Sequence, residues 1–344
     1  MLFFRVVKET IQKRSVRLFF ALFLLLIVLA GIIFWVNQKE VRQPEFGITY
    51  STIYAQELGL DPLTVYQALL TELSVKLVRL PVYWSEVEKE QGVYDWDQVD
   101  QLMTLSNAHG VEVTMVLGEK VPRWPECFIP DWALELSEQE REQVLKEFLT
   151  IAVQRYQSFS SLERWQIENE PFFPFGVCPE RRNELVFEEI ALVSDLDDHP
   201  VQLTVSGELE SWWQSALHAD VLGFSLYRVT WNKTVGFSVY PLSPTFYRIR
   251  ATVMKWLTQK VIISELQAEP WIFISLDEQT TEFWSELFTP DDFEKNVQFA
   301  EQTGVSEVYF WGAEWWYYLR MQGFDSLWNY AENLFDSQTV FVKH

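Results

Sequence analysis

Short runs of apolar residues recur along the chain from residue 46 onward, and longer segments with helical amphipathic patterning separate them. The short runs are rich in β-branched and aromatic residues, which is typical of strands that are buried on both faces of a parallel sheet. They predict eight strands, at residues 46–51, 75–82, 111–118, 162–170, 201–207, 220–227, 260–265 and 306–312.

The segments between these runs carry signals for the starts and ends of helices. Residues 61–62 (Asp-Pro) combine an N-cap with a proline at the first helical position. Residues 137–140 (Ser-Glu-Gln-Glu) form a capping box that opens an amphipathic segment to about residue 157. Residues 289–290 (Thr-Pro) open a further helix, which Gly304 ends in the way that Gly110 ends an earlier one.

Eight strands that alternate with helices predict an α/β fold of the (β/α)₈ (TIM) barrel type. An open, doubly wound sheet is the competing fold, and the lack of a glycine-rich phosphate loop after the first strand weakens it. We expect one catalytic domain over residues 46–336, with residues 37–45 as a linker before it and residues 337–344 as a tail after it.

The N-terminal region predicts a single transmembrane helix. Residues 18–36 are 19 consecutive residues without a charge, close to the roughly 20 residues that cross a bilayer. A cleaved signal peptide is the alternative, since Ala30 and Gly31 offer a cleavage site. Residues 1–17 form a basic tail, so the positive-inside rule places this tail in the cytoplasm. We therefore expect a single-pass protein of the cell membrane with its catalytic domain on the extracytoplasmic side.

Charge and composition narrow the range of partners. The chain has a net charge of −22, and residues 1–17 carry five basic residues and one acidic residue, so the remainder is at −26. Such an acidic body argues against nucleic acid as a partner. The 16 tryptophans suit surfaces that stack on sugar rings, although large cores also use tryptophan. The four histidines are scattered, so we expect no metal ion and no cofactor.

The chain contains two cysteines, Cys127 and Cys178. Both fall in segments that we place on neighbouring loops at one end of the barrel. A disulfide is allowed in an exported domain, and two free thiols are the alternative.

The clearest chemical signal is Trp-Gln-Ile-Glu-Asn-Glu-Pro at residues 165–171, where a strand ends in Asn169 and Glu170. The carboxyl ends of barrel strands point into the active site, so Glu170 is expected to project there. A dry surrounding raises the pKa of a carboxyl group, which can then donate a proton near neutral pH. A surface glutamate in a turn is the alternative. Glu168 precedes by two residues, and strand alternation would point it the same way, one layer deeper.

The Asn-Glu-Pro ending of the fourth strand resembles the acid/base motif of glycoside hydrolase clan A. This clan groups retaining (β/α)₈ enzymes, including the cellulase, mannanase and β-galactosidase types of families 5, 39 and 42. The resemblance implies Glu170 as acid/base and Glu265, which ends the seventh strand in Ile-Ser-Glu, as nucleophile, with Glu269 as fallback. A retaining pair of carboxyls lies about 5–5.5 Å apart.

The same resemblance implies further substrate-binding residues. Arg79, at the end of the second strand, corresponds to an arginine near the nucleophile, where it would keep Glu265 ionised. Asn169 corresponds to the residue that binds the 2-hydroxyl of the sugar, and Tyr227 to a tyrosine that hydrogen-bonds the nucleophile. The remaining candidates are tryptophans that could stack on sugars or pack in the core: Trp311, which corresponds to the tryptophan under the reacting sugar, with Trp124, Trp271, Trp315 and Trp316.

The sequence departs from many clan members after the third strand. This strand ends in Gly118-Glu119-Lys120, where a histidine or an aromatic residue often lines the site. We expect a membrane-anchored retaining glycosidase that acts on a β-linked oligo- or polysaccharide. The open alternatives are a non-catalytic carbohydrate-binding barrel, a transglycosylase that remodels envelope polysaccharide, and a barrel enzyme of another class.

Overall fold

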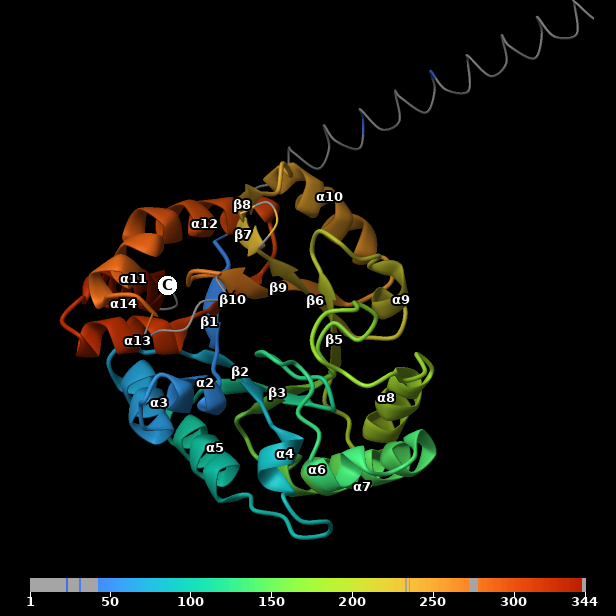
Figure 1. Cartoon of the computed structure of the whole chain (residues 1–344). Coiled ribbons are helices and arrows are strands. Elements are labelled where there is room, and N and C mark those ends of the chain that lie inside the picture. The colour runs from blue at the N-terminus through green and yellow to red at the C-terminus, as the bar shows by residue number, and fades with distance from the viewer. Residues whose placement is uncertain are drawn as a thin grey trace, which may run out of the picture.

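The computed structural model describes residues 43–232, 234, 236–271 and 278–341, together with positions 23 and 31. Eight parallel strands close into a barrel, in the order β1-β10-β9-β6-β5-β4-β3-β2 (Figure 1). The strands are β1 (Glu45–Thr49), β2 (Leu77–Pro81), β3 (Glu112–Leu117), β4 (Leu162–Ile167), β5 (Val201–Ser206), β6 (Val221–Leu226), β9 (Lys260–Gln267) and β10 (Glu307–Trp311). The predicted barrel and its eight strands are therefore confirmed.

Helices surround the barrel, as Figure 1 shows, and cover the outer side of the strands. They are α2 (Thr52–Glu57), α3 (Pro62–Thr71), α4 (Trp84–Val87), α5 (Asp97–His109), α6 (Asp131–Leu134), α7 (Glu138–Tyr156), α8 (Leu185–Leu196), α9 (Trp213–Ala216), α10 (Pro244–Met254), α11 (Thr281–Leu287), α12 (Pro290–Thr303), α13 (Ala313–Met321) and α14 (Ser326–Phe341).

The predicted helix boundaries are confirmed where capping chemistry defines them. Asp61 accepts a hydrogen bond from the backbone of Thr64 at the start of α3, and Ser137 forms the capping box of α7. Gly110 and Gly304 end α5 and α12 in the left-handed conformation, which glycine adopts without a steric penalty.

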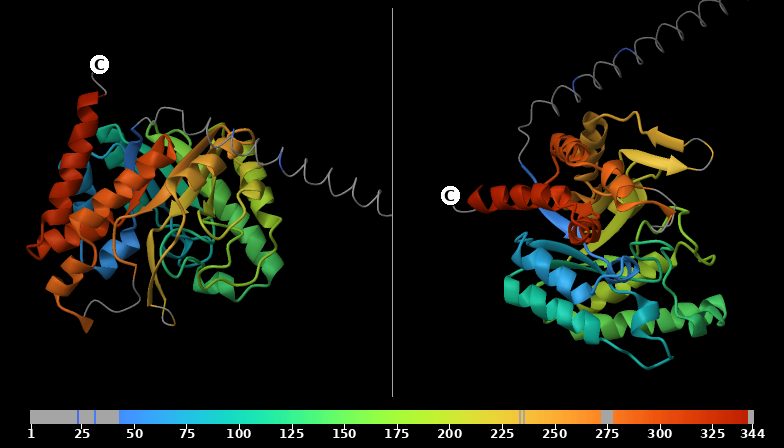
Figure 2. Two further views of the ribbon diagram at one scale, coloured as in Figure 1. Left: turned by 90° about the horizontal axis from the view of Figure 1, so that it is seen from above. Right: turned by 60° about the vertical axis from the view of Figure 1, so that its left-hand side comes forward.

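Two features extend beyond the predicted barrel. An antiparallel hairpin, β7 (Val229–Asn232) and β8 (Gly236–Val239), follows β6, and Figure 2 shows it projecting beyond the barrel. The final helix continues past residue 336 to Phe341. Gln338 joins this helix to the start of β1, because its side chain accepts a hydrogen bond from Phe46 N (3.0 Å) and donates to Pro44 O (2.7 Å). The expected tail at 337–344 therefore begins inside α14.

The predicted membrane segment at 18–36 lies outside the described residues, apart from positions 23 and 31. Within the described part of the chain, no helix has the length and apolar character needed to cross a membrane.

Polar side chains occupy the upper interior of the barrel, below the carboxyl ends of the strands. Arg79, Gln166, Gln202 and Thr204 are all buried. Gln202 donates to Gln166 Oε1 at 2.9 Å, and Arg79 Nε donates to the same oxygen at 2.7 Å. Because buried polar groups are stable only when they are hydrogen-bonded, this layer forms a fixed base for the residues above it.

Candidate active site

Glu265 lies near the end of β9 with both carboxylate oxygens bound by side chains from other strands. Arg79 Nη1, from β2, donates to Oε1 at 2.6 Å, and Tyr227 Oη, just after β6, donates to Oε2 at 2.8 Å. The Glu265 side chain is only 7% exposed and that of Arg79 is fully buried. A charged donor and a hydroxyl on opposite oxygens fix the orientation of the carboxylate.

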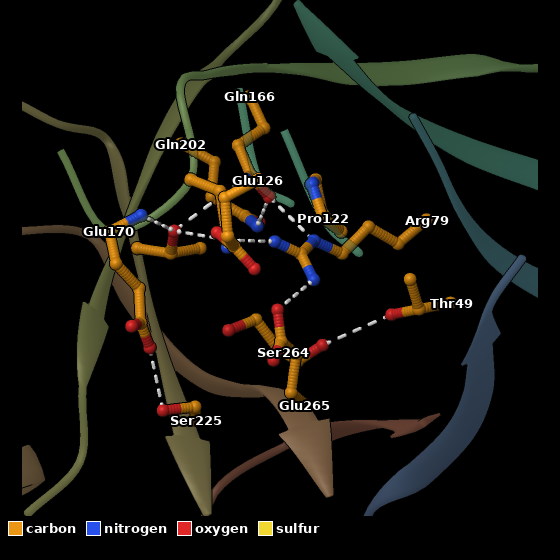
Figure 3. Close-up of polar contacts among 12 residues, drawn as sticks. Thr49, Arg79, Pro122, Glu126, Gln166, Glu170, Gln202, Ser225, Ser264 and Glu265 are labelled. Carbon is orange, nitrogen blue, oxygen red and sulfur yellow. Dashed lines mark hydrogen bonds and ion pairs between the residues drawn. The ribbon is translucent and has the colours of Figure 1, made fainter. Parts of the chain in front are cut away.

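Arg79 also connects Glu265 to the end of β4. Its Nη2 donates to Asn169 Oδ1 at 2.7 Å, while Nε reaches Gln166. Figure 3 shows the guanidinium pointing from β2 towards Glu265 at the centre of the barrel. One rigid side chain therefore positions two of the residues that the sequence analysis singled out.

Glu170 follows the end of β4 and faces a different environment. Ser225 Oγ, on β6, donates to its Oε1 at 2.7 Å, and its backbone N–H donates to Thr204 Oγ1 at 2.9 Å. Burial raises the pKa of Glu170 well above its ordinary value, and the charge of Glu265 raises it further. The hydrogen bond from Ser225 opposes this rise but does not cancel it. This carboxyl group therefore holds a proton more tightly than an exposed glutamate does.

The two glutamates are brought together through Ser225. Ser225 and Glu265 are register partners on the adjacent strands β6 and β9, and neighbouring strands lie about 4.8 Å apart. Glu170, whose carboxyl contacts Ser225, thus reaches across β5 to the strand beside the one that carries Glu265 (Figure 3).

Glu168 does not share the direction of Glu170, so this expectation is wrong. The strand ends at Ile167, and Glu168 adopts φ +59°, which breaks the alternation. Its carboxylate accepts from the backbone N–H groups of Glu119 (3.0 Å) and Lys120 (2.7 Å) and pairs with Arg181 at 2.8 Å. Gly118 lies against this carboxylate, since a Cβ there would come within 2.5 Å of Glu168 Cδ.

Glu126 is a third carboxyl group at the site, and the sequence analysis missed it. It lies in the loop between β3 and α6, is 6% exposed, and accepts a hydrogen bond from Asn169 Nδ2 at 2.9 Å. Lys120, in the same loop, donates to the carbonyl oxygens of Glu170 (3.0 Å) and Phe173 (2.9 Å). Ser225 and Thr204 were also missed: Ser225 is the one polar side chain of β6, whereas Thr204 alternates with apolar residues along β5, together with Gln202 and Ser206.

The loop that carries Glu126 is fastened to the loop after β4. Cys127 and Cys178 form a disulfide, and Val177 N donates to Pro125 O at 2.9 Å. This resolves the question of the two cysteines in favour of the bridge. The backbone there is unusual, because four of the five described non-glycine residues with positive φ belong to this region: Arg123 (+96°), Glu126 (+78°), Glu168 (+59°) and Glu170 (+43°).

A second charged cluster lies beside Trp311, at the end of β10. Arg123 donates to Glu269 Oε1 at 2.5 Å and to Glu314 Oε2 at 3.3 Å. Its guanidinium also lies 4.1 Å from the ring centre of Trp311 and 3.7 Å from that of Tyr54. One face of Trp311 is therefore covered by Arg123, and Glu269 is engaged by Arg123 instead of Arg79.

The remaining candidate tryptophans fall into two groups, one beside the proposed site and one in the core. Trp124 is 52% exposed and contacts Phe175, which contacts Trp271, and Trp271 packs edge-on against Tyr227 at 4.4 Å. These rings form an aromatic wall that leads outward from Tyr227.

Trp315 and Trp316 cannot stack on a sugar, which corrects the expectation for both. They lie in α13 and are 3% and 0% exposed. Trp316 Nε1 donates to Ala268 O at 2.8 Å, and Trp315 packs against Tyr318 and Trp284. Both rings belong to the core, because α13 starts immediately after Gly312 and turns this face inward.

The described residues contain no group of three or more histidine, cysteine, aspartate or glutamate side chains arranged to hold a metal ion. The site itself offers two carboxyl groups with different surroundings: Glu265, which is bound by Arg79 and Tyr227, and Glu170, whose pKa is raised by burial.

Comparisons with known proteins place this geometry in context. The model of glycosyl hydrolase family 10 matches residues 66–191, a segment that includes Arg79, Asn169 and Glu170. A search of curated proteins finds no match.

The fold is similar to that of several solved structures. GH5_18 from Streptomyces cattleya, in complex with GlcNAc, has a TM-score of 0.53 at 15% identity over 79% of this chain and 71% of that chain. GH5_18 from Bifidobacterium longum has a TM-score of 0.55 at 12% identity over 78% and 70%. A β-galactosidase from Rahnella sp. R3 has a TM-score of 0.53 at 12% identity over 80% of this chain and 51% of that chain, so this chain spans about half its length.

Proposed function

We propose that this chain, which is a glycoside hydrolase of clan A, cleaves a β-linked oligo- or polysaccharide by double displacement, with Glu265 as nucleophile and Glu170 as acid/base. The contrast between the two carboxyl groups carries the proposal. Glu265 is bound by Arg79 and Tyr227, whereas burial and the charge of Glu265 raise the pKa of Glu170. Two carboxyls with opposed surroundings are what a nucleophile and a general acid require.

In the first step, an oxygen of Glu265 attacks the anomeric carbon, and the bond from that carbon to the leaving oxygen breaks. Glu170 gives its proton to the leaving oxygen. In the second step, Glu170, now ionised, takes a proton from a water molecule, whose oxygen attacks the anomeric carbon and releases Glu265. The enzyme returns to its starting protonation state and the sugar keeps its anomeric configuration.

The short path between the carboxyls supports a retaining mechanism. Glu170 contacts Ser225, the register partner of Glu265 on the next strand. The charge of Glu265 also acts on Glu170, and such proximity fits the separation of about 5–5.5 Å used by retaining enzymes.

A β-linked substrate with more than one sugar is supported by two observations. The aromatic wall from Tyr227 to Trp124 offers ring faces outside the reacting centre. Among the structurally similar proteins, one GH5_18 enzyme is seen in complex with Manβ1-4GlcNAc, and another is an exo-β-1,4-mannosidase.

We further propose that residues 18–36 anchor the enzyme in the cell membrane with the barrel on the extracytoplasmic side. The 19 uncharged residues and the basic residues before them motivate the anchor. The Cys127–Cys178 disulfide supports an oxidising compartment. The described chain enters the barrel at the amino end of β1, whereas the proposed catalytic residues lie at the carboxyl ends of the strands.

The mechanism is tested by trapping the covalent intermediate. The chain is incubated with a panel of activated 2-deoxy-2-fluoro glycosides, and its intact mass is measured before peptides are mapped. We expect an adduct on Glu265 with at least one sugar. The Glu265→Gln variant should give no adduct, whereas Glu269→Gln, the matched control, should still be labelled on Glu265.

An adduct on Glu269, or none with any sugar on folded protein that nonetheless hydrolyses a glycoside, would overturn the assignment of the nucleophile. The anchor is tested separately: after a carbonate wash, the full chain should remain with membranes, and deletion of residues 1–37 should release it. Release of the full chain by the wash would exclude the anchor.

A further inference from the structure

The proposed mechanism uses two carboxyl groups, but the site contains a third that the mechanism leaves without a task. Glu126 Oε2 accepts a hydrogen bond from Asn169 Nδ2 at 2.9 Å. Asn169 Oδ1 in turn accepts from Arg79, which binds Glu265. Glu126 is therefore connected to the proposed nucleophile through only two intervening side chains, and Figure 3 shows Glu126, Arg79 and Glu265 close together.

The backbone around Glu126 holds this side chain in a fixed position. Its N–H donates to Arg123 O at 2.6 Å, and its carbonyl accepts from Val121 N at 2.8 Å. The next residue, Cys127, is bridged to Cys178. Gly176 lies so close that a Cβ there would come within 2.6 Å of Glu126 Cβ. Such fastening on several sides is typical of groups that must be positioned accurately for binding.

The groups that face Glu126 come from four elements. Lys120 lies in its own loop, Arg79 on β2, Glu265 on β9, and Glu170 beyond β4, where the charge of Glu126 also acts on it. The charge of Glu126 also contributes to the raised pKa of Tyr83, which follows β2. Burial raises the pKa of Glu126 to about 8, and Glu265 adds to the rise, against the opposing effects of Lys120, Asn169 and Arg79. At neutral pH the carboxyl is therefore mostly protonated and can donate as well as accept.

One oxygen of this carboxyl remains available. Oε2 is taken by Asn169, and no hydrogen bond links Oε1 to any residue in the described part of the chain. A ligand hydroxyl that binds Asn169 Nδ2 would lie within reach of Glu126, since the two groups are already in contact. A group that donates and accepts beside a fixed amide is well suited to bind a hydroxyl.

We propose that Glu126 is a substrate-binding residue that acts in its neutral form, with its carboxyl hydrogen-bonded to the 2-hydroxyl of the reacting sugar alongside Asn169. This inference rests on the proposed function, because it concerns the same bound sugar. It adds a residue that selects substrates by that hydroxyl and makes binding depend on the protonation of a second glutamate.

The pH dependence separates this role from simple support of Asn169. Activity then requires protons on both Glu170 and Glu126, so kcat/KM of the wild type should fall at alkaline pH with a limiting slope of two on logarithmic axes. The Glu126→Gln variant keeps a neutral group of the same shape. In this variant the alkaline limb of the kcat/KM profile should move to higher pH, and its limiting slope should drop to one. At mildly acidic pH, kcat/KM of the variant should stay within about threefold of the wild-type value.

The control and a second readout make the test independent of folding. Glu119→Gln changes another buried carboxyl of the same loop, which points away from the site to Arg141, and should leave the alkaline limb unchanged. Glu126→Ala should lower kcat/KM about tenfold. It should also reduce, by a similar factor, the discrimination between an aryl glycoside that carries a free 2-hydroxyl on the sugar that labels Glu265 and the 2-deoxy counterpart of that glycoside.

Three results would overturn the inference. The pH profiles of Glu126→Gln and the wild type could coincide, or Glu126→Gln could lose as much activity as Glu126→Ala at every pH, which would indicate a required charge. The third is unchanged 2-deoxy discrimination in Glu126→Ala. In each case wild-type hydrolysis still supports the proposed function, whereas a folded wild type that hydrolyses no glycoside would refute that function and this inference with it.

Discussion

Replacement of Arg79 by methionine tests the arrangement on which the proposed site depends. The substitution keeps an unbranched side chain but removes a guanidinium that is fully buried and donates to Glu265, Asn169 and Gln166 at 2.6–2.7 Å. Glu265 would keep the hydrogen bond from Tyr227 as its remaining side-chain contact among the bonds described.

The magnitude follows from the burial of both partners. Removing one member of a buried ion pair costs about 3–5 kcal/mol, because the other charge remains without compensation. Solvent screening reduces this cost very little, because the Arg79 and Glu265 side chains are 0% and 7% exposed. We therefore expect Arg79→Met to lower the free energy of unfolding by about 4 kcal/mol. By contrast, Lys89→Met, which breaks an exposed pair with Glu86 (69% and 47% exposed), should cost less than about 1 kcal/mol.

The assay is urea unfolding followed by tryptophan fluorescence for Arg79→Met, Glu265→Gln and the double variant. In the double variant no buried charge is left alone, so its loss should be smaller than the sum of the single losses by about 1–3 kcal/mol. If the losses add to within about 0.5 kcal/mol, the pair is not coupled and the reasoning fails.

Three further predictions follow. The folded-state pKa of Glu170 is raised and its protonated form is the active one, so kcat/KM should be highest below that pKa and be lost as the pH rises through it. Glu170→Ala should lower kcat/KM about 10²–10⁴-fold for substrates with poor leaving groups, and added azide should restore activity. Equal losses for good and poor leaving groups would refute the role of Glu170 as the acid. Trp316→Ala should lower unfolding free energy by about 3–5 kcal/mol, whereas Trp124→Ala should spare stability and raise KM for oligosaccharides; the reverse pattern in melting and kinetic assays would contradict their placement. Cys127→Ser opens a bridge that spans 51 residues and should cost about 4 kcal/mol in urea unfolding, and an equal midpoint for variant and wild type would argue against the bridge.

The barrel was predictable because its signals are local. Each buried strand needs its own apolar run, and each helix carries its own cap, as Asp61 and Gly304 illustrate. The convergence of the carboxyl ends of all barrel strands also predicted that Glu170 projects into the site, whereas Glu265 and Arg79 were expected there from the resemblance to clan A.

The parts that could not be predicted depend on loop geometry. The alternation rule failed at Glu168 because a positive φ follows directly after the strand. Glu126 reaches the site only because its loop folds back and is bridged to the loop after β4, and no local pattern encodes that path. Sugar stacking and core packing stayed open for Trp315 and Trp316, because the sequence does not show that α13 starts directly after β10 and turns both rings inward.

The positive φ angles at Arg123, Glu126, Glu168 and Glu170 have a consequence for engineering. A non-glycine residue in this conformation costs about 1–3 kcal/mol, so glycine at any of these positions would relieve the backbone. At Arg123 and Glu168 the loss of buried ion pairs with Glu269 and Arg181 would outweigh this gain. Selection for thermal tolerance alone would therefore favour replacing Glu126 and Glu170, on which the proposed chemistry depends. A directed-evolution experiment that screens only for heat resistance should therefore accumulate substitutions in the loops after β3 and β4 and yield stable barrels with poor turnover. Ser74, the fifth non-glycine residue with a positive φ, lies before β2, where a change to glycine would stabilise the backbone without loss of activity.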